Sequence, residues 1–456
     1  MFRRRITSEG LSHHSYVLAD GGEAVVIDPR RDVDVYLHLA DEQGFRIRWV
    51  LETHRNEDYV VGSTALAAAT DAGILHGAGL PFGYGEPVRE GDTIGVGSLR
   101  FRALETPGHT DESLTWAMSD TDAADEPVFA FTGDALFVGD VGRTDLYGPE
   151  EEERLARTLH RSLFEKILPL GDWVVLQPAH GGGSVCGGAI SERDLSTLGF
   201  ERRHNPSLLA DGAAFVERQR AQRQVRPPYF RRMERWNLEG PPIELAPPRL
   251  VPLALDRFEG LREEGVRVID TRMPQAFGGA HVPGSINVWL GGLTAYLSWV
   301  AAPDEPIVLV LPERADVEAV ARTLFRIGYD RVEGHLQGGF EAWQNAGRPV
   351  ESTATVDVAS LPRLLEREEA VVLDVRKPDE WEGGSLPGAR RIFVGDLPRH
   401  LGELPRDRLV ISMCSVGHRG GIGASLLQAA GFERVANFLG GLTAWKAAGH
   451  PVDGRG

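Results

Sequence analysis

Three stretches in the first half of the chain each present a metal-ligand residue at the end of an apolar run. WVLETH ends on His54, ALETPGHT presents His109, and FAFTGDALF presents Asp134. A fourth stretch, VVLQPAHGGG, presents His180. Because strand ends and the loops after them gather at one edge of a sheet, we expect these side chains to converge. Two imidazoles and one carboxylate with open positions suit non-haem Fe(II) and O₂ chemistry.

The segment LETHRNEDYVVGS, which contains the first of these histidines, is poor in ligands for a second metal. It offers His54, Asn56, Asp58 and Tyr59. Since structural and catalytic zinc is bound by imidazole, thiolate and carboxylate, Asn56 and Tyr59 are poor zinc ligands. Beside His54 and Asp58, these positions of the segment therefore add no good zinc ligand.

Short strands and one amphipathic helix must position these residues. The expected strands are AVVID, IRWVLET, LRFRALET, PVFAFTG and DWVVLQP. The expected helix covers 149–168, and its acidic start suits a helix N-terminus. The Arg- and Pro-rich segment 216–248 is interpreted as a solvated helix face followed by a linker, rather than as an anionic-ligand patch.

The size and charge of the chain limit what it can be. Its 456 residues suffice for about three domains. The net charge of −17 argues against a nucleic-acid or anionic-membrane partner, since both need a basic face. The chain has two cysteines, no apolar run of about 18 residues, and no apolar core after the basic start MFRRRITSEG. We therefore expect a cytoplasmic protein with free thiols.

The second half of the chain contains an internal repeat. VRVIDTRMPQAFGGAHVPGSINV (266–288) resembles AVVLDVRKPDEWEGGSLPGARRI (370–392), and other matches recur at the same separation of about 103 residues. A solenoid repeat spans only roughly 20–50 residues, so this period indicates two copies of one small domain. The copies cover about 248–352 and 353–456, and their alternating strands and helices predict parallel α/β sheets.

The last copy carries the sharpest local motif, RLVISMCSVGHRGGIGASLLQAAG. A strand delivers Cys414 to a short loop, and a helix begins directly after it. The loop that cradles the sulfur consists of Ser415, Val416, Gly417 and His418. Backbone N–H groups, the helix N-terminus and Arg419 would stabilise a thiolate or persulfide, so Cys414 is the expected nucleophile.

The middle copy lacks this nucleophile. Alignment of GYDRV with GFERV sets Leu311 against Cys414 and Asp316 against Arg419. Leucine cannot carry sulfur, and an acidic loop repels an anionic sulfur donor. We therefore expect an inactive copy that serves as a spacer or docking surface.

Residues 1–235 resemble the metallo-β-lactamase fold in its glyoxalase II and persulfide dioxygenase branch. The matching stretches are TH at 53–54, TPGHTDES, FTGDALFVGDVGRTDL and PAHGGGSVCG. NPSL and PPYFRRMERWNLEGPP resemble the connecting segment of persulfide dioxygenases fused to rhodanese modules. The resemblance spans nearly the whole chain.

This resemblance implies an α/β chain of three domains. An αββα sandwich would cover 1–247, with the connecting segment from about 208, and two rhodanese-like domains with parallel sheets would follow at 248–352 and 353–456. The resemblance assigns one Fe(II) per chain to His54, His109 and Asp134, with zinc as the alternative. The hydrolase branch binds two zinc ions through further positions, which here are Asn56, Asp58, Tyr59 and His180.

The last copy resembles rhodanese, a sulfurtransferase domain with the motif Cys-x-x-Gly-x-Arg. LDVRKPDEW and LGGLTAW match the same family, while Ser385 replaces the histidine that usually precedes Pro-Gly-Ala. Since that position is structural in the family, the resemblance still implies thiosulfate-type sulfur transfer through Cys414, with Arg419 in the same loop.

Together the resemblances predict a persulfide dioxygenase with sulfurtransferase activity. It would use a small thiol persulfide and O₂, release sulfite or thiosulfate, and form homo-oligomers. Two alternatives remain open at this point: a glyoxalase II-like thioester metallo-hydrolase, and a sulfurtransferase whose N-terminal domain is a non-catalytic scaffold.

The roles of several residues are left open by the sequence. Arg143 could bind a carboxylate of the carrier thiol or form a salt bridge with Asp145 or Asp140. Tyr59 and His180 are candidates for the substrate cleft.

Cys186, six residues after His180, could relay sulfur or sense oxidation, or it could be a packed small side chain.

Overall fold

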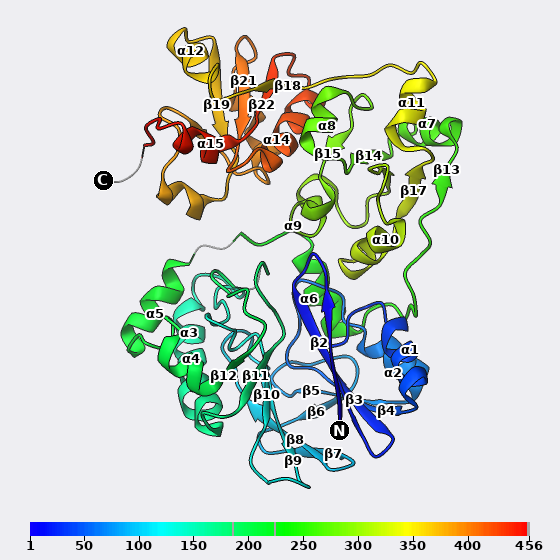
Figure 1. Ribbon diagram of the computed structural model, residues 1–456, viewed down its shortest axis with the longest axis vertical. Helices are drawn as coiled ribbons and strands as arrows, with labels where there is room; N and C mark the ends of the chain where they lie inside the picture. The colour runs from blue at the N-terminus through cyan, green and yellow to red at the C-terminus, as the bar shows by residue number, and fades with distance from the viewer. Residues whose placement is uncertain (185–186, 223–224, 454–456) are drawn as a thin grey trace. The chain divides into compact units, whose positions relative to one another are not determined.

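A computed structural model of the chain (Figure 1) describes residues 1–184, 187–222 and 225–453. The chain divides into two compact units. The first takes in Met1–Gln224, Tyr229–Pro247 and Phe325–Gly328. The second takes in Val225–Pro228, Pro248–Leu324 and Tyr329–Gly456. Each unit has two sheets of its own.

The first unit is built on two six-stranded sheets. One sheet has the order β1 (Phe2–Ser8), β2 (His13–Asp20), β3 (Glu23–Ile27), β4 (Arg46–Leu51), β5 (Gly73–Gly77) and β6 (Glu86–Val88). The other has the order β12 (Ser196–Thr197), β11 (Val175–Pro178), β10 (Phe129–Gly133), β9 (Leu114–Asp120), β8 (Leu99–Glu105) and β7 (Thr93–Val96). The strands expected from the sequence correspond to β3, β4, β8, β10 and β11.

Alternating side chains of the first sheet serve two separate cores. In β3, Val25 and Ile27 pack with Trp116 of β9 in the core between the sheets. Val26 of the same strand packs with Tyr36 on the opposite face of its sheet. Since successive strand residues point to opposite faces, one apolar strand fills both cores. This sheet is therefore covered on its outer face by helices.

The helices of the first unit cover the outer faces of the two sheets (Figure 1). They are α1 (Asp34–Gln43), α2 (Ser63–Thr70), α3 (Glu152–Arg161), the π-helical turn η1 (Ser162–Ile167), the 3-10 turn η2 (Leu168–Leu170), α4 (Leu198–His204), α5 (Gly212–Ala221) and α6 (Phe230–Glu239). Leu159 of α3, Leu163 of η1 and Phe215 of α5 pack in one cluster with Leu176 of β11. The expected αββα sandwich is therefore confirmed.

Helix α6 differs from the expectation of a solvated helix face and linker. Phe230 and Met233 are fully buried in it. The Asn237 side-chain amide donates to the carbonyl oxygens of Asn56 (2.6 Å) and Tyr59 (2.8 Å) and accepts from the Val61 N–H (3.1 Å). The expectation was wrong here because the many arginines of this stretch hide its apolar side. Helix α6 is instead a clamp on the backbone of the segment after β4.

The second unit contains two five-stranded sheets of identical topology. The first has the order β13 (Pro252–Leu253), β17 (Val332–Leu336), β16 (Ile307–Val310), β14 (Arg267–Asp270) and β15 (Ile286–Asn287). The second has the order β18 (Ala354–Val356), β22 (Val435–Phe438), β21 (Leu409–Met413), β19 (Ala370–Asp374) and β20 (Arg390–Arg391). All the strand pairs of both sheets are parallel, as the sequence repeat predicts.

The helices of the second unit follow the same repeat. The first copy contains α7 (Leu255–Glu263), α8 (Pro274–Gly279), η3 (Leu290–Gly292), α9 (Leu293–Val300), α10 (Val317–Arg326) and α11 (Gly339–Asn345). The second contains α12 (Leu361–Glu366), η4 (Pro378–Gly383), α13 (Leu397–His400), η5 (Leu401–Glu403), α14 (His418–Ala429) and α15 (Gly441–Ala447). Even a local ion pair repeats, between Arg272 and Asp270 and between Arg376 and Asp374, both at 2.6 Å.

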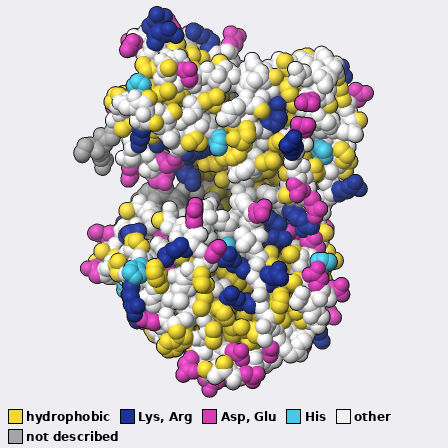
Figure 2. Space-filling view, in the orientation of Figure 1, with side chains coloured by type: hydrophobic (Ala, Val, Ile, Leu, Met, Phe, Trp, Pro, Cys, Tyr) yellow, Lys and Arg dark blue, Asp and Glu magenta, His cyan; other side chains and the backbone are white. Residues whose placement is uncertain are grey.

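The surface of the chain carries charges of both signs. On the face that Figure 2 shows, Lys and Arg side chains lie among Asp and Glu side chains. Within the described ranges, the structure contains no helix that is long and apolar enough to cross a membrane.

We predict that Asn237→Ala loosens the segment after β4. The substitution leaves the carbonyls of Asn56 and Tyr59 and the N–H of Val61 without their buried partner. The free energy of unfolding should therefore fall by about 2 kcal/mol. Hydrogen exchange of the 54–61 amides and a denaturant titration measure this effect. Arg235→Ala, an exposed change on the same helix, is the control, and equal protection in both variants would contradict the clamp.

Candidate functional site

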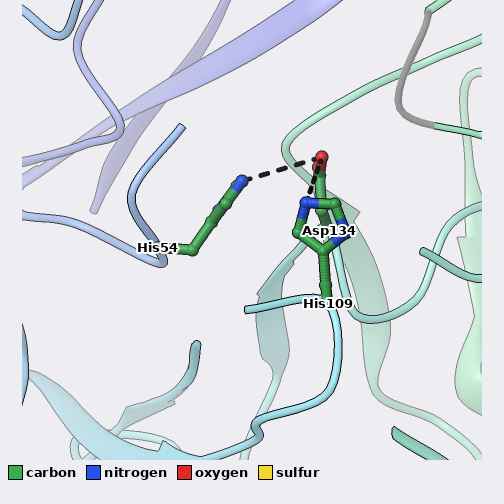
Figure 3. Close-up of side chains that lie close together, drawn as sticks. All are labelled: His54, His109 and Asp134. Carbon is green, nitrogen blue, oxygen red and sulfur yellow. Dashed lines mark ion pairs between the residues drawn. The ribbon is translucent and has the colours of Figure 1, made fainter. Parts of the chain in front are cut away.

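His54, His109 and Asp134 converge at one edge of the sandwich (Figure 3). His54 follows β4, His109 lies between β8 and β9, and Asp134 follows β10 directly. Asp134 Oδ2 lies 3.7 Å from His54 Nε2 and 3.6 Å from His109 Nε2. All three side chains are buried. The structure thus brings together the three residues that the sequence singled out as a ligand set.

In each of these three side chains, the polar atom that faces the other two residues makes no hydrogen bond. His54 Nε2, His109 Nε2 and Asp134 Oδ2 have no hydrogen-bond partner among the described residues. The remaining polar atom of each side chain is held: His54 Nδ1 by Thr53 Oγ1 (2.9 Å), His109 Nδ1 by the Arg143 carbonyl (2.9 Å), and Asp134 Oδ1 by His180 Nδ1 (2.7 Å). Buried polar atoms without partners are costly, so three that face one point fit a bound cation.

The hydrogen bonds around His54 fix which of its nitrogens faces the cation position. The Thr53 hydroxyl donates to Asp28 Oδ2 (2.8 Å), so its oxygen must accept from His54 Nδ1–H. The lone pair of His54 then lies on Nε2. Gly133, with φ +54°, makes room for this contact, because a Cβ there would lie 2.6 Å from Thr53 Oγ1.

The protonation states of His54 and Asp134 suit metal binding. Burial lowers the pKa of His54 to about 4, which leaves the imidazole neutral near pH 7. Burial of Asp134 opposes its ionisation, but the neighbouring His180, His54 and His109 outweigh this effect and lower the pKa of the carboxyl group. A neutral imidazole and an ionised carboxylate are the forms that bind metal.

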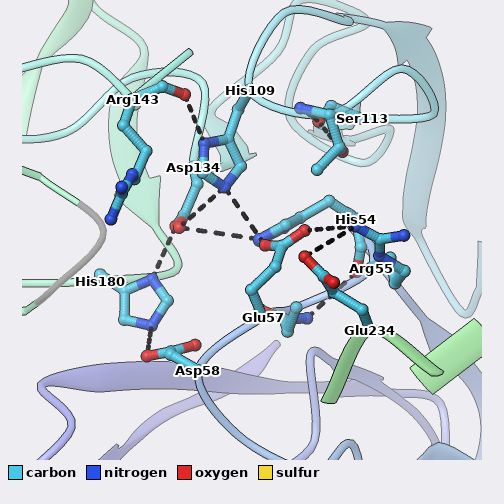
Figure 4. A network of polar contacts seen from close by, with 12 residues as sticks. His54, Arg55, Glu57, Asp58, His109, Ser113, Asp134, Arg143, His180 and Glu234 are labelled. Atoms are coloured by element: carbon cyan, nitrogen blue, oxygen red, sulfur yellow. Dashed lines mark hydrogen bonds and ion pairs between the residues drawn. The ribbon is translucent and has the colours of Figure 1, made fainter. Parts of the chain in front are cut away.

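His180 lies between two carboxylates rather than at an open cleft (Figure 4). Its Nδ1 is 2.7 Å from Asp134 Oδ1, and its Nε2 is 2.9 Å from Asp58 Oδ2. Since both partners only accept, both ring nitrogens must carry protons. Burial opposes this charge, but the two carboxylates raise the pKa of His180 well above its ordinary value. An imidazolium therefore joins the two acids, and neither nitrogen is left to bind substrate.

Asn56 and Tyr59 do not face the triad as ligands. The Asn56 amide donates to the carbonyl of its neighbour His54 at 3.1 Å. Tyr59 is fully buried, and its ring lies 3.9 Å from the ring of His13. Tyr59 therefore packs inside the unit, against the expectation that it lines a substrate cleft.

Arg143 adopts the structural alternative that the sequence left open. Its guanidinium forms a two-point pair with Asp145, with contacts of 2.6 and 2.8 Å. The side chain is buried, and the residue touches the triad through its carbonyl oxygen, which holds His109. Arg143 thus positions a metal-ligand candidate through its backbone.

Cys414 lies at the end of β21, and α14 begins four residues later. The Gly417 N–H points to Cys414 Sγ at 3.1 Å, and Gly417 has φ +100°, a backbone conformation that favours glycine. Ser415 and Val416 complete the turn, and His418 is the first residue of α14. The thiol is 1% exposed. The Gly417 N–H therefore faces the sulfur directly before the N-terminus of α14, as the loop sequence predicts.

Glu380 of η4 is a partner of this loop that the sequence analysis missed. Both of its oxygens bind the Arg419 guanidinium, one at 2.8 Å, and Ser415 Oγ lies 3.1 Å from Glu380 and 3.0 Å from Arg419. Burial opposes the charge on Glu380, but Arg419 lowers the pKa of this carboxyl to about 2. Arg419 is thus fixed in place by a carboxylate that offsets its charge.

The middle copy contributes two aromatic side chains to the pocket that contains Cys414. This pocket has a volume of about 350 Å³, and Trp289 and Tyr296 line it together with Lys377 and His418. The ring of Trp289 lies 5.0 Å from that of His418. A pocket of this size fits a small organic molecule. The sequence repeat gave no sign of this contribution, because it compares the copies and not their contacts.

The middle copy itself holds no thiol at the equivalent position. Leu311 follows β16 and is buried, and Asp316 caps the start of α10 through the Ala319 N–H at 3.1 Å. In the last copy, Ser385, which stands where rhodanese usually has histidine, donates to Asp374 at 2.6 Å. Ser385 thus supports the Arg376–Asp374 ion pair. Cys186 lies outside the described residues, and its role stays a prediction.

The fold and the two sites define a metallo-β-lactamase sandwich followed by two rhodanese-like domains. The model of the metallo-beta-lactamase superfamily matches residues 9–180, and that of the rhodanese-like domain matches 255–346 and 357–448. The chain belongs to the metallo-beta-lactamase superfamily and carries two rhodanese-like domains.

Among its relatives is the mitochondrial persulfide dioxygenase ETHE1 of Homo sapiens, 30% identical over 215 residues, which cover 44% of this chain and 74% of the relative. A probable metallo-hydrolase of Burkholderia pseudomallei is 31% identical over 194 residues, which cover 34% of this chain and 64% of the relative. A crystal structure of a metallo-beta-lactamase from Staphylococcus aureus is similar with a TM-score of 0.65 and 31% identity over 74% of this chain and 99% of that one. The resemblance seen in the sequence is thereby confirmed.

We predict that Trp289 limits access to Cys414. In a Cys186→Ser background, Cys414 is the sole cysteine of the chain. Trp289→Ala should then speed alkylation of Cys414 roughly fivefold, the rate equivalent of about 1 kcal/mol of lost aromatic packing. Met273→Ala, an exposed change in the same copy, is the control. Equal alkylation rates in all three proteins would show that Trp289 does not wall the pocket.

Proposed function

We propose that this chain oxidises a low-molecular-weight thiol persulfide to sulfite at one Fe(II) and transfers sulfane sulfur through Cys414. The observation that carries the proposal is the set of three unpartnered, mutually facing atoms of His54, His109 and Asp134. The family relationship to persulfide dioxygenase ETHE1 supports the same reaction.

The oxidation balances with one O₂ for each persulfide. R–S–S⁻, O₂ and H₂O give R–SH and HSO₃⁻, so the outer sulfur loses four electrons to O₂ and the S–S bond breaks. Bound Fe(II) supplies the open coordination positions and the redox capacity that this chemistry needs. The chain holds the two imidazoles through Thr53 and the Arg143 carbonyl, and it keeps the site buried.

Sulfur transfer uses the second site. The Cys414 thiolate attacks the outer sulfur of the donor, forms a Cys414 persulfide, and releases the donor as a thiolate or as sulfite. The Gly417 N–H and the start of α14 stabilise the negative charge on sulfur. Because both sites belong to one chain, a shared persulfide reaches either one at a raised effective concentration.

Thioester hydrolysis at two zinc ions is less well supported. The second zinc would need Asp58 and His180, but His180 already joins Asp58 to Asp134 by two hydrogen bonds. Among the residues that the structure describes, no second group of three ligand atoms lies close together. A non-catalytic scaffold is the remaining alternative, and three unpartnered buried ligand atoms argue against it.

We predict that protein loaded anaerobically with Fe(II) consumes one O₂ per sulfite formed from glutathione persulfide. His109→Ala should lower this rate by at least about 100-fold, since it removes a ligand. His38→Ala, an exposed histidine of α1, should not change it. An oxygen electrode, a sulfite assay and elemental analysis make the measurement. Two zinc ions with thioester hydrolysis, or no metal at all, would contradict the proposal.

Cys414→Ser separates the two activities. We expect it to abolish sulfur transfer from thiosulfate to cyanide, because serine cannot carry a sulfane sulfur. O₂ uptake with preformed persulfide should persist. Loss of both activities would contradict the division between the two sites.

A further inference from the structure

We infer that Glu57 is a fourth protein ligand of the metal, so that the bound ion meets two imidazoles and two carboxylates. The inference rests on the proposed metal site but not on the reaction proposed for it. In the sequence, Glu57 stands out only as a second acid beside Asp58.

One oxygen of Glu57 faces the triad (Figure 4). Glu57 Oε2 lies 3.6 Å from His109 Nε2, the same separation as between Asp134 Oδ2 and that nitrogen. The side chain is 1% exposed, and Oε2 has no hydrogen-bond partner in the described part of the chain. Glu57 Oε2 thus has no hydrogen-bond partner and faces His109 Nε2, although it lies farther from at least one of the other two triad atoms, which lie within 4.8 Å of each other.

The other oxygen of Glu57 shows how the carboxylate is held. Arg55 Nη2 donates to Glu57 Oε1 at 3.0 Å. Arg55 is fixed in turn, since its backbone N–H donates to Glu112 (2.7 Å) and its guanidinium lies 3.8 Å from Glu234. A buried carboxylate needs compensation at both oxygens, and Arg55 serves only one of them. A cation between the four side chains would serve the other.

The chemistry of the carboxylate agrees with this role. A carboxylate oxygen is a preferred ligand for divalent iron and manganese. The neighbouring Asn56 amide is instead bonded to the backbone at His54. The segment after β4 therefore presents two ligands, His54 and Glu57, to one ion.

A second carboxylate changes what the metal can do. Fe(II) with Asp134 alone keeps one net positive charge, whereas Fe(II) with Asp134 and Glu57 is neutral. The coordination positions not taken by the protein would be open to a sulfur ligand and O₂. The neutral centre attracts anions less strongly and favours hard divalent metals over thiolate-seeking ones.

Cobalt-loaded protein tests the inference directly, because the visible absorption of Co(II) reports its coordination number. Glu57→Gln keeps the shape of the side chain and removes the ligand charge, and Glu57→Asp keeps the charge on a shorter arm. We expect both variants to change the Co(II) spectrum and to weaken binding about 10–100-fold in a chelator competition. Glu239→Gln, which removes an exposed carboxylate of α6, should leave spectrum and affinity unchanged.

The outcomes separate this inference from the proposed function. If wild-type protein binds Co(II) and Glu57→Gln leaves the spectrum unchanged, Glu57 is not a ligand, whatever the change in affinity, while the triad and its chemistry stand. If wild-type protein binds no Co(II), the metal site itself fails and takes the inference with it. Thermal unfolding of each apo variant checks that its fold is intact.

Discussion

The hydrogen-bonded chain from Asp134 through His180 to Asp58 is the constraint on which the metal centre depends. It engages one oxygen of Asp134 and thereby leaves the other to face His54 and His109. It also places a positive charge where a second metal would need its ligands. In a buried setting such charge-assisted bonds are strong, and breaking one leaves a buried charge without its partner. One arrangement therefore favours a single ion and disfavours a pair.

The surrounding fold supplies this arrangement from distant parts of the chain. Strand ends deliver His54, Asp134 and His180, while the loop between β8 and β9 delivers His109. Helix α6, some 180 residues after the first histidine, holds the backbone at Asn56 and Tyr59. In the second unit, Trp289 and Tyr296 of the middle copy similarly line the pocket that contains Cys414 of the last copy. The middle copy thus has leucine in place of this cysteine but forms one wall of the pocket around it.

The features that depend on a local sequence pattern could be predicted from the sequence. Apolar runs ending in His54, His109 and Asp134 identify strand ends, and the repeat identifies two copies of a small domain. The features that depend on packing between distant elements could not be predicted in this way. Whether Glu57 points inward, whether Arg143 is already paired with Asp145, and whether Tyr59 is buried against His13 are decided by neighbours from other elements. The buried face of α6 was missed because Phe230, Met233 and Asn237 are separated in the sequence by arginines and other polar residues.

Anomalous diffraction at the iron edge, from crystals of the anaerobically Fe(II)-loaded protein, tests the central claim most directly. The account predicts one anomalous peak per chain, bounded by His54, His109 and Asp134. It also predicts that no peak lies between Asp58 and His180, where the hydrogen-bonded chain should persist. Two peaks, with His180 turned from Asp134 toward a second metal, would contradict the account and favour thioester hydrolysis at two metal ions.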